Sequence, residues 1–133
     1  MRRLKSCRRS LPVSKIDKLL KEATKLLQQY PYYKKCHVLN RGRSYVKFRL
    51  VITKDLFVQV NRNELALITN LALINQSKRI YGRDEYRTHW HRHASDNPSS
   101  HNFSEEGKKK VSLPEFLSEV DNILCEKGLL QHL

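Results

Sequence analysis

Four of the six histidines of this chain lie close together, three of them alternating within residues 83–93 and the fourth at His101. If that segment is extended, His89, His91 and His93 project to one side, because side chains alternate along a strand. Imidazoles at this spacing support two kinds of chemistry. They can act as a general acid and a general base, or they can share one transition-metal ion.

Acid–base cleavage of RNA is the first possibility. One imidazole would take the proton of a ribose 2'-hydroxyl, another would protonate the leaving 5' oxygen, and an arginine would stabilise the charge on the phosphorus centre. We expect His91 and His93 to be the acid–base pair and Asp84 to orient an imidazole. Either Arg83 or Arg92 would stabilise the phosphate. The candidate catalytic residues are Arg83, Asp84, His89, His91, Arg92, His93 and His101.

A metal centre is the second possibility. No cofactor is expected for acid–base chemistry, whereas a metal-dependent nuclease would need a divalent transition metal. The alternative without catalysis or metal binding is an exposed polar loop whose histidines only form ion pairs with nearby acidic residues. The sequence has no Gly-rich phosphate loop and no GxSxG motif, so no other group of residues is a comparable candidate for a catalytic site. The candidate metal ligands are Asp84, His89, His91, His93 and His101.

The net charge of +13 is concentrated at the start of the chain. Residues 1–50 contain 15 Lys and Arg against Asp17 and Glu22, whereas residues 51–133 balance to zero. Such an excess favours nucleic acid or an acidic protein as a partner, or else serves only as a solvated basic face. Trp90, with Tyr81 or Tyr86, would stack an unpaired base or pack in the core. The expected RNA-binding residues are Lys15, Lys18, Lys21, Lys25, Arg41, Arg43, Lys47, Arg49 and Trp90.

The elements that must position these residues follow from periodicity. Residues 14–30 have apolar side chains at helical spacing behind a capping Ser14, and Pro31 ends the run. The sequence Ser112-Leu113-Pro114-Glu115 predicts the start of a second helix, which Gly128 ends. Period-two alternation predicts strands at residues 45–52, 56–60, 71–75 and 79–81, with 86–93 as a fifth strand or extended segment.

The predicted fold is therefore α+β, an antiparallel meander of about four or five strands flanked by an N-terminal and a C-terminal helix. We expect residues 31–42 to form a loop, Gly82 to mark a bulge or the end of pairing, and a hairpin to turn at Gln76 and Ser77. Residues 1–13 are predicted to be a flexible basic arm and residues 14–133 a single domain.

Composition restricts the class of protein further. No apolar run approaches the roughly 20 residues that span a bilayer, and residues 1–12 lack the apolar core of a secretory signal. The three cysteines form no CxxC pair, which argues against a disulfide framework or a thiolate zinc site. We therefore expect a cytoplasmic protein with no membrane partner.

The order of these parts resembles the TumE family of small toxin–antitoxin proteins over about residues 43–126. The similarity lies in the strand at 45–50, the Arg83-Asp84 pair, the His91-Arg92-His93 motif and the helix start Leu113-Pro114-Glu115-Phe116. Asp84, His91 and His93 match best by position. Glu85 stands where the family prefers Asn, and Asp96-Asn97 with His101 offers a second alignment of the same motif.

The resemblance implies a toxin that acts on RNA and is neutralised by a helix-turn-helix antitoxin. A small basic ribonuclease of this kind is the leading hypothesis. A non-enzymatic nucleic-acid-binding or accessory module, or a metal-dependent nuclease using the same histidines, is the alternative. An unpaired strand edge also makes a homo-oligomer possible.

Overall fold

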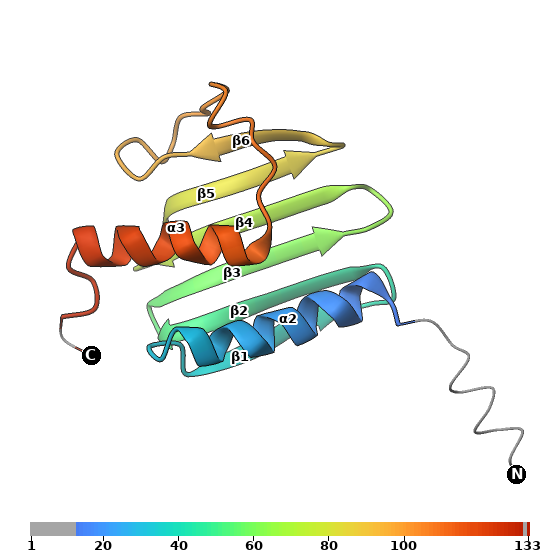
Figure 1. Cartoon of the computed structure of the whole chain (residues 1–133), viewed down its shortest axis with the longest axis horizontal. Coiled ribbons are helices and arrows are strands. Elements are labelled where there is room, and N and C mark those ends of the chain that lie inside the picture. Colours follow the sequence, from blue (N-terminus) through green and yellow to red (C-terminus); the bar gives the residue numbers. More distant parts are fainter. Residues whose placement is uncertain (1–12, 132) are drawn as a thin grey trace, which may run out of the picture.

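The structure, a computed structural model, describes residues 13–131 and Leu133. Its centre is a six-stranded antiparallel sheet in the order β1 to β6, so each strand pairs with its neighbours in the sequence (Figure 1). The predicted α+β meander is confirmed, with six strands in place of four or five. Residues 1–12 of the expected basic arm lie outside the described range. The strands are β1 (Lys35–Arg41), β2 (Tyr45–Thr53), β3 (Leu56–Asn63), β4 (Ile68–Asn75), β5 (Lys78–Tyr86) and β6 (His89–His93).

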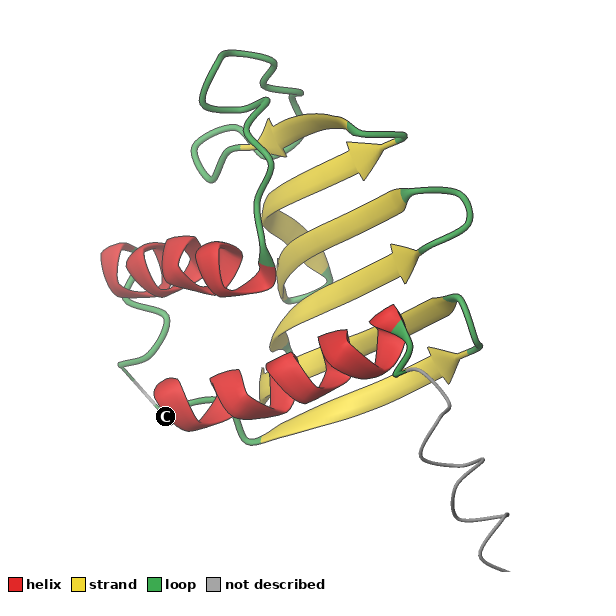
Figure 2. Ribbon diagram, turned by 45° about the vertical axis from the view of Figure 1, so that its right-hand side comes forward, coloured by secondary structure: helices red, strands yellow, loops and turns green. Residues whose placement is uncertain are grey.

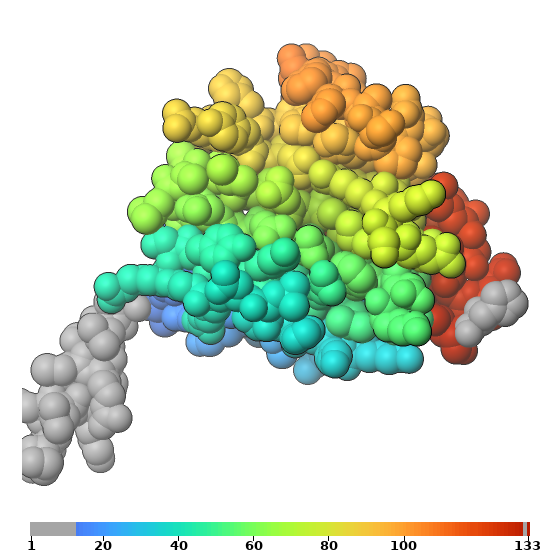
Figure 3. Space-filling view, turned by 180° about the vertical axis from the view of Figure 1, so that it is seen from behind, coloured from blue at the N-terminus to red at the C-terminus, as the bar shows by residue number. Residues whose placement is uncertain are grey.

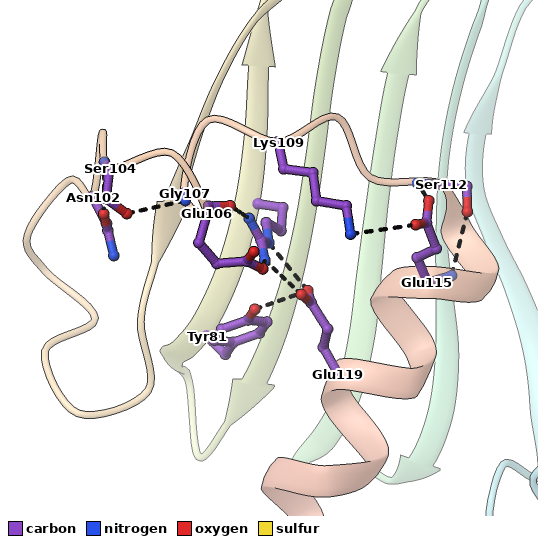
Figure 4. Close-up of polar contacts among 10 residues, drawn as sticks. Tyr81, Asn102, Ser104, Glu106, Gly107, Lys109, Ser112, Glu115 and Glu119 are labelled. Atoms are coloured by element: carbon purple, nitrogen blue, oxygen red, sulfur yellow. Dashed lines mark hydrogen bonds and ion pairs between the residues drawn. The ribbon is translucent and has the colours of Figure 1, made fainter.

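Two helices, α2 (Lys15–Gln29) and α3 (Leu113–Glu126), lie on the same face of the sheet (Figure 2). The Ser14 side chain caps α2 by accepting a hydrogen bond from the Asp17 amide. At α3 the capping box is complete, because the side chains of Ser112 and Glu115 each accept a hydrogen bond from the other's backbone amide (Figure 4). Neither described helix is long and apolar enough to cross a membrane.

The capping box gives a first prediction. Replacing Ser112 with alanine should lower the free energy of unfolding by about 1 kcal/mol, because the backbone amide of Glu115 loses its hydrogen-bond acceptor. Urea denaturation measures the change. The exposed Ser118 lies in the middle of the same helix, and Ser118→Ala should leave stability unchanged or raise it slightly. Equal losses in the two variants would contradict the capping role.

Apolar side chains fill the space between the helices and the sheet. Burial alternates strictly along β2, where every second residue from Val46 to Ile52 is buried. The strand β2 lies beneath α2, and its buried residues belong to one core cluster with Ile16, Ala23 and Leu26 of α2 and the buried face of α3. Apolar residues that recur every two positions in a strand and every 3.6 positions in a helix therefore line the same core from opposite sides.

The strand β1 lies within residues 31–42, which were expected to be a loop, and that expectation was wrong. It is an edge strand paired only with β2, and six of its seven residues are exposed. Alternation in sequence arises where one face of a strand is buried, so an edge strand without a buried face carries no such signal.

The region around Gly82 also differs from prediction. Gly82 neither ends the pairing nor forms a bulge, because β5 runs through it to Tyr86. The irregularity lies earlier, where the register shifts between Leu73 and Ile74 of β4. The predicted turn at Gln76 and Ser77 is confirmed, since both residues have positive φ between β4 and β5.

The face of the sheet opposite α2 and α3 is here called the uncovered face. It points toward the viewer in Figure 3, which shows the molecule from behind. No described helix lies on it. The strand register places one polar side chain from every strand in a single row across this face. The row consists of Asn40, Lys47, Asn61, Asn70, Asp84 and His91.

Candidate functional site

The last hairpin of the sheet brings the histidines to the uncovered face. Arg87 and Thr88 form its tight turn with positive φ, so β6 begins at His89 and residues 86–93 are not one continuous strand. The register places His91 opposite Asp84 and His93 opposite Gly82. His89, His91 and His93 therefore project to one side, as expected.

Asp84, His91, His93 and His101 converge at this edge of the uncovered face, and we call these four residues the histidine cluster. The Asp84 Oδ2 atom lies 3.2 Å from His93 Nε2 and 3.5 Å from His91 Nε2. The two Nε2 atoms are 3.2 Å apart. His101 returns on the loop that follows β6, with its ring centroid 4.7 Å from that of His91 and 4.6 Å from that of His93. His89 is exposed and lies opposite Tyr86, outside the cluster.

A backbone carbonyl fixes the orientation of His93. Its Nδ1 lies 2.8 Å from the carbonyl oxygen of Pro98, and because a carbonyl only accepts, Nδ1 must carry the proton. The Nε2 atom then faces Asp84. His93 is buried, whereas His101 is exposed, so the cluster has a fixed inner side and an accessible outer side.

Arg79 holds the Asp84 carboxylate in place. Its Nη1 donates to Oδ2 at 2.9 Å and its Nη2 to Oδ1 at 2.7 Å, while Asn70 Nδ2 donates to Oδ1 at 3.1 Å. Burial alone would raise the pKa of Asp84, but the hydrogen bonds from Arg79 lower it below its usual range. The carboxylate is therefore charged and immobile beside the imidazoles.

The electrostatics of His91 follow from the same neighbours. Burial lowers the pKa of His91, and although Asp84 opposes that shift, His93 and His101 reinforce it. The neutral imidazole is thereby favoured in His91.

Arg79 was not among the predicted site residues. It is five residues from Asp84, a spacing that places two side chains on opposite faces of a regular strand. The register shift opposite Leu73 and Ile74 changes the phase, so that Arg79 lies on the same face as Asp84. Nothing in the sequence marks that shift.

Gly82 makes room for Arg79, because a methyl group there would occupy the space of the Arg79 guanidinium. We expect Gly82→Ala to displace Arg79 from Asp84 and to lower the free energy of unfolding by about 2 kcal/mol. The pKa of Asp84, followed by NMR, should rise. Gly42→Ala is the control, since no atom lies within 4 Å of a methyl group there. An unchanged Asp84 pKa in Gly82→Ala would contradict the positioning role of Arg79.

Arg83, expected to stabilise phosphate, lies on the helix-covered face and is fully buried. Its Nε and Nη2 donate to the carboxylate of Glu119 at 3.1 and 2.5 Å, and its Nη1 donates to the Glu106 carbonyl at 2.7 Å. Burial opposes the charge, but the Glu119 hydrogen bond outweighs it and raises the pKa of Arg83. The structure therefore corrects this prediction. Arg92 lies opposite Arg83 in the register, so it shares that face and does not join the cluster either.

Trp90 belongs to the core, with 8% of its surface exposed, and it is not placed to stack a base beside the histidines. Tyr81 is likewise buried and donates to Glu119 at 2.8 Å (Figure 4). Burial raises the pKa of Tyr81 to about 12, so it keeps its proton. The exposed aromatic residue beside the cluster is instead Phe103, whose ring centroid lies 5.3 Å from that of His91.

The predicted RNA-binding residues do not form one surface. Lys47 and Arg49 lie on the uncovered face with the histidine cluster, and Arg49 Nε donates to Gln59 at 3.1 Å. Arg43 is exposed in the turn between β1 and β2, and Arg41 is exposed at the end of β1 and forms an ion pair with Asp17. The lysines of α2 are exposed on the helix-covered side, and two of them line a cleft of about 400 Å³ between the helices. The α2 lysines are Lys15, Lys18, Lys21 and Lys25.

The chain matches no family model, no curated protein and no solved structure. What this site does must therefore be argued from its own geometry, and the likeness to TumE proteins stays a prediction.

Proposed function

We propose that the protein is an endoribonuclease of the TumE-like toxin type, in which His91 and His93 cleave RNA by acid–base chemistry. The observation that carries the proposal is the convergence of Asp84, His91 and His93 within 3.5 Å on the uncovered face. RNA suits such a site because its 2'-hydroxyl is a nucleophile already placed beside the phosphorus. Two imidazoles that accept and donate a proton are then sufficient.

The surroundings of the two rings distinguish their roles. The Pro98 carbonyl and the Asp84 carboxylate face the two nitrogens of His93, and both are acceptors. A doubly protonated His93 satisfies both, which suits a general acid. His91 lies further from Asp84 and acts as the base that takes the 2'-hydroxyl proton. Asp84 is a positioning residue, held by Arg79.

Charge on the uncovered face supports RNA as the substrate. Asp84 is the acidic member of the polar row, and Arg79 neutralises it. Lys47 lies in the same row and Arg49 in the next, so the face remains basic. Asn61 and Asn70 lie between Lys47 and Asp84 in the row and offer amide groups there. With strands about 4.8 Å apart, the row extends about 24 Å from the cluster toward β1. A single strand lying along it would place one phosphate at the histidines.

The experiment that tests the proposal is incubation of the purified chain with end-labelled single-stranded RNA, with and without EDTA. Cleavage that survives EDTA and leaves a 2',3'-cyclic phosphate supports acid–base chemistry. Tight binding without cleavage would leave only a binding module. If the resemblance to TumE proteins extends to their regulation, co-expression with a helix-turn-helix antitoxin should suppress the cleavage.

The path of the RNA gives a separate prediction. Replacing Lys47 and Arg49 together with alanine should weaken RNA binding and reduce the slope of log affinity against log salt by about two, one for each lost phosphate contact. Fluorescence anisotropy at several salt concentrations measures both. The control removes two exposed charges from the helix-covered side, in Lys110→Ala with Lys127→Ala, because Lys110 lines the cleft between the helices and Lys127 ends α3. Equal weakening in the two double variants would mean that charge alone, and not the uncovered face, holds the RNA.

A further inference from the structure

We infer that the histidine cluster is also a binding site for a divalent transition-metal ion, Zn(II) above all, with His91, His93 and His101 as ligands, and that the bound ion stops cleavage. Metal binding stands on the geometry alone. Its effect on cleavage rests on the proposed function, because it requires His91 and His93 to be the acid–base pair.

The spacing of the nitrogen atoms suits a metal. Each of the three histidines offers one ring nitrogen, and these atoms all lie within 4.8 Å of one another. Tetrahedral zinc with Zn–N bonds of about 2.0–2.1 Å separates its ligand atoms by about 3.4 Å. His91 Nε2 and His93 Nε2 already lie 3.2 Å apart. Only His101, on its exposed loop, has to move closer.

The contacts of His93 also suit a bound metal ion. With Nδ1 donating to the Pro98 carbonyl, the neutral ring turns the lone pair of Nε2 toward Asp84 Oδ2, 3.2 Å away. A lone pair facing a carboxylate is repulsive, so a positive species belongs between the two atoms, either the proton of a doubly protonated ring or a metal ion. A backbone carbonyl on the far nitrogen is also the usual partner of a histidine that binds metal, because it fixes the ring and its tautomer.

The donor set selects the kind of metal. Three imidazoles favour Zn(II), Cu(II) or Ni(II) over Mg(II) and Ca(II), which prefer oxygen ligands. Asp84 supplies a charged oxygen as a fourth ligand or as a partner that orients the imidazoles, and Arg79 and Asn70 hold it. Because His101 and the neighbouring Phe103 are exposed, an ion can enter from solvent without disturbing the core.

Metal binding and acid–base catalysis exclude each other at this site. The bond from Nε2 to the ion uses the lone pair with which His91 accepts the proton of the 2'-hydroxyl. In His93 it displaces the proton that the ring donates to the leaving oxygen. One ion at the cluster therefore removes both the acid and the base.

The test titrates Zn(II) into the full chain, prepared without a histidine tag and freed of metal, by isothermal titration calorimetry. We expect one ion per chain, and His101→Ala should weaken binding by about 100-fold or more, because His101 is itself a ligand and the loss of an outer-shell partner of a ligand already costs about 10–100-fold. His101 lies on an exposed loop, so this variant should keep its fold, which circular dichroism checks. His37→Ala is the control, because His37 is an exposed histidine of β1. The absence of stoichiometric binding, or binding that His101→Ala leaves intact, would overturn the site.

A second measurement tests the effect on cleavage. One equivalent of Zn(II) should stop cleavage of single-stranded RNA, and EDTA should restore it. Cleavage that is unchanged by bound zinc overturns the inhibition. Cleavage that requires zinc overturns both the inhibition and the metal-free mechanism, but confirms the metal site. A chain that binds zinc and never cleaves RNA overturns the proposed function, and the inhibition with it, but confirms the metal site.

Discussion

Replacing both His91 and His93 with alanine should reduce RNA cleavage by about 10⁴-fold or more, because a positioned acid or base contributes about 10²–10⁴-fold each. Both rings lie on the uncovered face at the edge of the sheet, so the far-UV circular dichroism spectrum should not change. RNA affinity, measured by anisotropy, should also hold, because Lys47 and Arg49 remain. Cleavage rates on a defined oligonucleotide measure the loss.

The single variants and a histidine control sharpen this result. His91→Ala and His93→Ala should each lose much of the activity, because neither proton transfer alone completes the reaction. His37→Ala removes an exposed histidine from the far edge of the sheet and should cleave at the wild-type rate. Cleavage retained in the double variant would show that the histidine cluster is not the catalytic centre.

The largest loss of stability is expected from Glu119→Ala. The Arg83 guanidinium is fully buried, and Glu119 is its closest carboxylate partner at 2.5 Å. Removing that partner leaves a buried charge with only Glu106 beside it, which should lower the free energy of unfolding by about 3–5 kcal/mol. Tyr81 loses its acceptor in the same variant (Figure 4). Urea denaturation measures the change.

A double variant separates the cost of the unpaired charge from the value of the ion pair. Arg83→Met with Glu119→Leu should regain most of the stability lost in Glu119→Ala, because it removes both charges and fills the same space. The exposed Glu126 at the end of α3 is the matched control, and Glu126→Ala should change stability by less than about 0.5 kcal/mol. A small effect of Glu119→Ala would mean that water or Glu106 compensates the arginine.

Local signals in the sequence were sufficient to predict the helices and the central strands. Ser14 and the Ser112–Glu115 box mark helix starts whose hydrogen bonds are made within three residues. The strict alternation in β2 follows from one buried face. These features need no knowledge of distant contacts, whereas β1 is defined only by its pairing with β2.

The candidate site was predictable only in part. The alternation of histidines in β6 and the nearness of Asp84 follow from one hairpin, so the sequence contained that information. The contributions of Arg79 and Pro98 did not follow from it, because they depend on a register shift and on the path of a loop. Charge counting likewise identified the basic residues but not the face on which each one lies.

The order of strands along the sheet has a consequence for synthesis and folding. Because every strand pairs with the one before it, each pairing closes a short loop, and folding with such low contact order is fast for a β-rich chain. The sheet can therefore assemble strand by strand as the chain leaves the ribosome. The histidine cluster belongs to the final hairpin and the loop behind it, so the centre is completed only after five strands have been made. A nascent chain, itself attached to RNA, lacks the cluster until that last step.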